Sequence, residues 1–200
     1  MDGPVITRGA GGPVRRAALA LIALLTAVCT AACSGAPAEK QAPPPAFNET
    51  DVMFLQMGLA QITEGEQVAQ RAEQRAAGAE VRAVAAELRE QWQTESGTMQ
   101  RWLLGWERPM QADPSAGLHA GHGDLHSLRE EDVAALDQAK GADFDRTAVA
   151  LLLGNLHNSV ETMRMESAGG AYPPARSLAD QMAAARQQQI QRLLAVASAG

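Results

Sequence analysis

The chain has 200 residues, a formal charge of −6 at pH 7 and two cysteines, Cys29 and Cys33. Both cysteines precede the segment that can form a domain, so the fold must be held by packing rather than by disulfides. The acidic balance, with no basic stripe, argues against nucleic acid as a partner.

The first 33 residues have the pattern of an export signal. Ala17 to Val28 is an uncharged apolar run that follows a basic segment. The run is too short for a membrane-spanning helix, which needs about 20 apolar residues. Small residues then lead to Cys33, as in a bacterial lipobox, although Thr30 departs from the usual Leu or Val. We expect a signal peptide over 1–32 and a lipid on Cys33 that anchors the chain to the outer face of the bacterial cell membrane. Ordinary cleavage nearby, without a lipid, is the alternative.

The segment from 33 to 47 is rich in Pro and Ala, with three prolines in a row at 43–45. Such a composition favours extended polyproline geometry of about 3.1 Å per residue. We interpret it as a tether that holds the following domain roughly 40 Å from the bilayer by that rise.

From residue 48 to 199 the pattern is helical, and no stretch alternates apolar and polar residues as a strand would. Apolar side chains recur at spacings of three and four, which places them on one inward stripe of a helix. The capping-box form of residues 127–130 predicts a short helix that ends at Gly141. Long helices are expected at about Thr50–Ala77, Ala79–Trp106, Asp143–Ser167 and Ala175–Ser198, with stripes that include Val81, Ala85, Leu88, Trp92, Glu95 and Met99 in the second and Leu178, Met182, Ala185, Gln189 and Leu193 in the fourth.

The two predicted hairpins resemble copies of each other. A shift of about 95 residues places Phe54 over Val149 and brings Glu95 close to Gln189. A duplication explains why two similar hairpins follow each other. The predicted fold is therefore all-α, a four-helix bundle built from two duplicated helical hairpins.

Several segments resemble the domain-of-unknown-function 305 family. The run from Asp51 to Met57, the run from Glu80 to Ala85, and Glu95, Met99 and Trp102-Leu103 look like its first repeat, and Gly141 to Arg146 looks like the start of its second. The resemblance covers about residues 48–197. It implies an exported, ferritin-like four-helix bundle, and some family members bind copper.

The family signature is a Met followed by a Pro-His-His triplet in the first helix of each repeat, with further Met residues opposite. In this chain the two triplets fall on Ala60-Gln61-Ile62 and Asn155-Leu156-His157, so three of the four histidines are absent. The ligands that the resemblance implies are reduced to Met57, Met99, His157 and Glu95. Because thioether and imidazole ligands suit copper(I), their loss predicts a weak copper site.

A second candidate metal site lies in the loop between the hairpins. His119, His122 and His126 are spaced by three and four residues, with Asp124 among them. Imidazole and carboxylate ligands suit zinc or Cu(II), whereas Gly121 and Gly123 favour a plain solvated loop. Both interpretations stay open.

The sequence lacks the patterns of enzymes. No histidine follows a glutamate by three residues, as di-iron bundles require, and no metalloprotease, serine hydrolase or phosphate-loop motif occurs. We expect a non-enzymatic envelope lipoprotein with at most weak copper or zinc binding. The alternative is a structural or protein-interaction module that has lost the family metal site, with an unknown protein partner.

Overall fold

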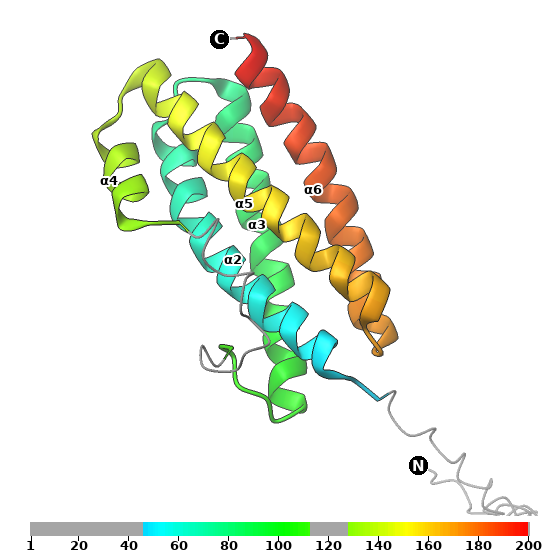
Figure 1. The fold of residues 1–200 in the computed structure, drawn as a ribbon. Helices are drawn as coiled ribbons and strands as arrows, with labels where there is room; N and C mark the ends of the chain where they lie inside the picture. The colour runs from blue at the N-terminus through cyan, green and yellow to red at the C-terminus, as the bar shows by residue number, and fades with distance from the viewer. Residues whose placement is uncertain (1–45, 113–127, 200) are drawn as a thin grey trace, which may run out of the picture. The chain divides into compact units, whose positions relative to one another are not determined.

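The computed structural model describes residues 46–112 and 128–199. The predicted signal peptide, Cys33 and nearly all of the predicted tether lie outside these residues. The described part is helical throughout and contains no strand, which confirms the all-α prediction. Four long helices form the bundle and one short helix lies beside it (Figure 1): α2 (Glu49–Arg75), α3 (Ala79–Gly105), α4 (Glu130–Gln138), α5 (Gly141–Gly169) and α6 (Pro173–Ala199).

Each long helix begins and ends within two residues of its predicted bounds. The start of α2 has a clear local cause, because Asn48 and Asp51 form a reciprocal capping box. The Asn48 side chain accepts from the Asp51 N–H at 3.1 Å, and the Asp51 carboxylate accepts from the Asn48 N–H at 2.6 Å. Two of the four unpaired N–H groups at the helix start are satisfied in this way.

The short helix differs from its prediction. It begins at Glu130 rather than at Ser127. The N-cap is Arg129, whose N–H donates to the Asp132 carboxylate at 3.1 Å. It ends at Gln138, and Gly141 begins α5 instead of ending α4. Gly141 has a φ of +56°, a conformation that glycine adopts without strain.

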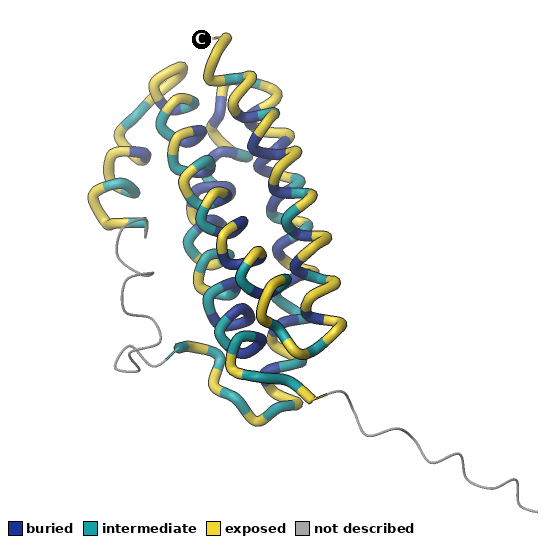
Figure 2. The backbone as a smooth tube through the Cα atoms, turned by 45° about the vertical axis from the view of Figure 1, so that its right-hand side comes forward, coloured by how far each residue is buried: buried dark blue, intermediate teal, exposed yellow. Residues whose placement is uncertain are grey.

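The long helices pack in a square. Helix α2 contacts both α3 and α5, and α6 contacts both α5 and α3, so that α3 and α5 lie diagonally across the bundle. Contact between α3 and α6 is the sparsest of the four sides, while α4 packs on α5. Buried residues line the inner side of each long helix (Figure 2), and Trp92, which is 2% exposed, is the largest fully buried side chain. The inward stripe predicted for the second helix is thereby confirmed.

The burial pattern reveals the duplication and fixes its register at 94 residues. Helices α3 and α6 are both 27 residues long and begin 94 residues apart. The predicted shift of about 95 was therefore one residue too long in the first helices of the hairpins. Adding 94 converts buried Val81, Ala85, Leu88, Trp92, Glu95 and Met99 into buried Ala175, Ala179, Met182, Arg186, Gln189 and Leu193.

A pair of aspartates confirms this register. The Asp51 carboxylate accepts from the N–H groups of Ala171 and Tyr172, at 3.1 and 2.9 Å, in the connection between α5 and α6. Asp145, which lies 94 residues later, accepts from Ala77 and Gly78, at 2.9 and 2.6 Å, in the connection between α2 and α3. The first helix of each hairpin thus holds the connection of the other hairpin.

Candidate functional site

The positions that resemble the family triplet lie on α2 and α5, where these two helices contact each other. The Asn155 side-chain amide donates to the backbone carbonyl of Gln61 at 2.8 Å, and the Gln61 side-chain amide donates to the Thr162 hydroxyl at 2.8 Å. Residues 61 and 155 are 94 apart, so the second triplet corresponds to Gly154-Asn155-Leu156. The sequence alignment on Asn155-Leu156-His157 was therefore one residue too far along the chain. Hydrogen-bonded amides occupy both of these equivalent positions.

There is little free volume around this amide pair. A methyl group at Gly65 would lie 2.8 Å from Asn155 Oδ1, and it would also meet the Trp92 ring. That oxygen is buried and has no hydrogen-bond partner among the described residues. The arrangement is a packed polar contact between helices rather than an open ligand shell.

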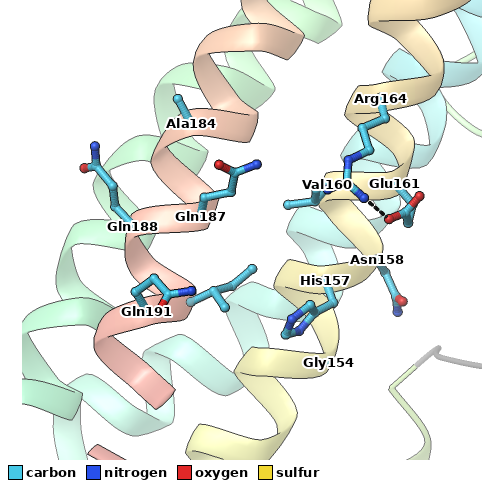
Figure 3. A pocket seen from close by; sticks show the side chains of 11 residues that line it. Gly154, His157, Asn158, Val160, Glu161, Arg164, Ala184, Gln187, Gln188 and Gln191 are labelled. Atoms are coloured by element: carbon cyan, nitrogen blue, oxygen red, sulfur yellow. Dashed lines mark hydrogen bonds and ion pairs between the residues drawn. The ribbon is translucent and has the colours of Figure 1, made fainter. Parts of the chain in front are cut away.

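His157 lies on the outside of the bundle. It is exposed beside a groove of about 820 Å³ between α5 and α6, which Gln187, Gln188 and Gln191 line from α6 (Figure 3). Its Nδ1 lies 2.7 Å from the Leu153 carbonyl. Because a carbonyl only accepts, Nδ1 carries the proton and Nε2 keeps its lone pair. His157 can therefore offer one imidazole nitrogen, away from the bundle core.

Glu95 is buried and paired. It is 8% exposed, and it forms an ion pair with Arg186, which is 1% exposed. Burial raises the pKa of Glu95, and the Arg186 charge opposes that rise. Removing either partner would leave a buried charge without compensation. The carboxylate is thus engaged by Arg186.

Arg186 belongs to a polar network that the sequence analysis missed, because Ala185 was placed on the α6 stripe instead. Its guanidinium donates to Gln91 at 3.0 Å and lies 5.7 Å from the Trp92 ring centre. Gln189 donates to the same Gln91 oxygen at 2.8 Å. This network fills the sparsely packed side between α3 and α6.

The two methionines occupy different environments. Met99 is fully buried, and a methyl group at Gly58 of α2 would lie 3.0 Å from its sulfur. Met57 is half-buried on α2. The structure therefore does not gather the bundle candidates, because Glu95 and Met99 are inside on α3 whereas His157 is outside on α5. Within residues 46–112 and 128–199, no group of three or more His, Cys, Asp or Glu side chains is placed to hold a metal ion.

His119, His122 and His126 lie outside the described residues. The described residues on either side of their segment both contact α2. Gln56 donates to the Pro109 carbonyl at 2.8 Å, and the Leu128 N–H donates to Glu64 at 3.4 Å. Burial raises the pKa of Glu64, and the Leu128 bond opposes this rise. On α2, the thioether of Met57 lies between these two contacts in sequence, and the carboxylate of Glu64 forms the second contact.

A buried pair of acids lies at the first turn of α2, where Asp51 is next to Glu166 of α5. Asp51 and Glu166 are both fully buried. Burial and the neighbouring Asp51 raise the pKa of Glu166 to about 8. Burial acts to raise the pKa of Asp51 as well, but hydrogen bonds from Asn48, Tyr172 and Ala171 lower it overall. Glu166 therefore holds the proton of the pair at neutral pH.

The fold and these sites define a four-helix bundle made of two equivalent hairpins. The family model of the Domain of unknown function (DUF305) matches residues 51–197, and the chain belongs to this family. No curated protein matches the chain. Among the helices that the structure describes, none is long and apolar enough to cross a membrane.

Three solved structures are similar to the chain. A DUF305 fragment from Deinococcus radiodurans has a TM-score of 0.65 at 19% identity and covers 77% of this chain and 97% of its own. A DUF305 protein from Streptomyces coelicolor that is described as secreted has a TM-score of 0.66 at 16% identity, with coverages of 72% and 89%. CopM in its Cu(II)-bound form has a TM-score of 0.60 at 22% identity, with coverages of 72% and 92%. At these identities the likeness shows the fold.

Proposed function

We propose that this protein is an exported, lipid-anchored envelope protein without enzymatic activity. The signal pattern before Cys33 supports export, and a family member described as secreted is consistent with it. The lipid on Cys33 is the anchor, and the bacterial membrane is the partner that the anchor requires. A chain without the lipid would lose this attachment.

The anchor is tested by replacing its acceptor. Cys33→Ala is expected to release or mislocalise the protein, because Cys33 is the only cysteine at the end of the signal. Detergent partitioning of cell extracts measures this directly. Wild-type protein found wholly in the aqueous phase would contradict the proposal.

We further propose that the protein binds copper or zinc at most weakly, through the histidines between the hairpins. A similar protein, CopM, is known in a Cu(II)-bound form. The observation that carries the proposal is the amide contact between Gln61 and Asn155, which occupies the signature positions of the bundle. Because Glu95 is paired with Arg186, the bundle offers few side-chain atoms that can bind a metal ion. The ligands that remain are His119, His122 and His126, with Met57 and Glu64 at the base of the loop.

The test separates the loop from the bundle. Replacing His119, His122 and His126 together with Ala is expected to abolish Cu(II) and Zn binding in calorimetry, with helical content unchanged. His157→Ala is the matched control and should lower the affinity little, because its imidazole belongs to no group of three or more His, Cys, Asp or Glu side chains among the described residues that could hold a metal ion. Tight binding that survives the triple change would place the site in the bundle, around Met57, Glu95, Met99 and His157.

A structural or protein-interaction module is the second candidate function. The contact between Asn155 and Gln61 and the ion pair between Glu95 and Arg186 both favour this function, because in each of them polar groups bind a neighbouring helix. Absence of any metal binding by the wild-type protein would leave this function standing alone.

A further inference from the structure

Four aromatic side chains gather at one end of the bundle. Trp106 stacks on Phe47 with ring centres 4.2 Å apart, and Tyr172 meets Trp106 and Trp102 edge-on at 5.1 and 5.4 Å. All four are half-buried rather than enclosed. Leu104, in the last turn of α3, is 65% exposed at the same end. We call the five residues Phe47, Leu104, Trp102, Trp106 and Tyr172 the aromatic end.

The aromatic end is also the end from which the chain leads back to Cys33. Figure 1 shows the start of α2, the end of α3 and the α5–α6 connection together at this end. Phe47 directly precedes the N-cap of α2, and 13 residues separate it from Cys33. A segment of that length spans at most about 45 Å. Along the chain, this is thus the end of the bundle nearest to a lipid on Cys33, and a tether that bends instead of extending fully lets this end meet the bilayer.

The chemistry of the aromatic end suits a lipid surface. Tryptophan and tyrosine rings have an apolar body and a polar group, and they concentrate where lipid headgroups meet the hydrocarbon. Arg108, which follows Trp106 by two residues, forms an ion pair with Glu49. Contact would therefore depend on apolar area rather than on attraction to anionic lipid.

We propose that the aromatic end docks on the headgroup region of the membrane that carries the lipid anchor. The inference rests on the proposed anchor for its direction and adds a second, weak contact to it. A second contact strengthens the attachment given by the lipid anchor without any new partner. Docking would also orient the long axis of the bundle so that it points away from the membrane surface. The start of α2 and the end of α3 would then lie nearest to the membrane.

The test uses the mature chain with Cys33→Ser, so that the acyl chain does not mask the contact and failure of lipidation does not affect the result. The probe is vesicles of phosphatidylcholine and phosphatidylglycerol, with and without brominated acyl chains that quench tryptophan. We expect weak partitioning with quenching. Leu104→Ser should weaken the partitioning about three- to tenfold, and Leu104→Trp should strengthen it.

The chain offers a matched control at its opposite end. Leu194 of α6 is also an exposed leucine, at 42%, and it lies toward the far end of the bundle. Leu194→Ser should leave partitioning and quenching unchanged. The proposal is overturned if both serine variants behave alike, or if no quenching occurs. It is also overturned if sedimentation without vesicles shows a dimer that Leu104→Ser dissociates, because the aromatic end would then serve a second copy of the chain.

Discussion

The two hairpin connections are held by the same device in different surroundings. Asp145 is half-buried where it binds the α2–α3 connection, whereas Asp51 is fully buried where it binds the α5–α6 connection. Beside Asp51 lies Glu166, at the position where the first hairpin has Ala72. Gly170 likewise replaces Ala76, and a methyl group at Gly170 would collide with the Glu166 carboxyl. One half therefore exchanged two alanines for a buried acid and a glycine.

This difference shows which parts of a duplicated fold are fixed and which can change. The carboxylate that accepts from two backbone N–H groups is present in both halves, because unpaired buried N–H groups are costly. The residues around it differ, and one exchange introduced a group that titrates near neutral pH. The first helices of the hairpins similarly keep a polar contact at residues 61 and 155 but not the histidines of the family signature.

The largest effect is expected where the halves differ most in their core. Trp92 corresponds to Arg186, and its ring fills the space against Gly65. Trp92→Ala removes this large buried side chain and should lower the free energy of unfolding by about 3–5 kcal/mol. Urea denaturation followed by circular dichroism measures the loss. Trp102→Ala, at a half-buried position on the same helix, is the control and should cost less; a Trp92→Ala protein as stable as wild type would show that the stripe was misread.

The two aspartates provide the most direct comparison between the halves. Asp51→Ala leaves the Ala171, Tyr172 and Asn48 N–H groups without their acceptor in a buried site, so we expect a loss of about 2–4 kcal/mol. Asp145→Ala exposes its two N–H groups to water more readily and should cost about 1–2 kcal/mol. Urea denaturation of both variants at neutral pH measures the difference. Equal losses would mean that burial does not distinguish the two connections.

Glu166 adds a pH dependence at a position where the first hairpin has Ala72. Its pKa of about 8 in the folded protein lies above the ordinary value of 4.5, so the folded state holds the extra proton between these values. The stabilisation is present in full below about pH 4.5 and is lost as the pH rises through about 8. Arg176 opposes the shift and Asp51 favours it, so we expect a fall in unfolding free energy of about 2–3 kcal/mol across this range.

Glu166→Gln tests this dependence, because an amide has nearly the size of the carboxyl group but does not titrate. Urea denaturation between about pH 5 and pH 8.5 should show a flatter profile for this variant than for wild type. The gain relative to wild type should be greatest at the alkaline end. An unchanged slope would assign the pH dependence to other groups.

The sequence predicted the elements that depend on local pattern. Spacing of apolar residues gave the four long helices and the burial of Trp92, and the resemblance gave the arrangement of the bundle. Arg186 was missed because a charged residue on an apolar stripe is recognised only through its partner, Glu95, which lies on another helix. Glu166 and Asp51 were missed for a similar reason. A carboxylate near the end of a helix is typical of a helix cap. The burial of Glu166 is revealed only by the structure, in which Gly170 packs against its carboxyl group.

The register between the halves depended on long-range contacts as well. Apolar periodicity alone tolerates a slip of one residue, and the hydrogen bonds of Asp51 and Asp145 to the opposite connections remove the ambiguity. This correction moves His157 out of the family triplet and places Asn155 opposite Gln61.

Calorimetric titration with Cu(II), at about pH 7.5 and about pH 5.5, tests the central claim that metal binding has left the bundle. The wild-type mature chain is compared with the variant in which His119, His122 and His126 are replaced by Ala. Imidazole must be neutral to bind a metal, so loop binding should be weak at the higher pH and nearly absent at the lower. Tight binding at the higher pH that the loss of His119, His122 and His126 does not reduce would contradict the account and return the site to the bundle.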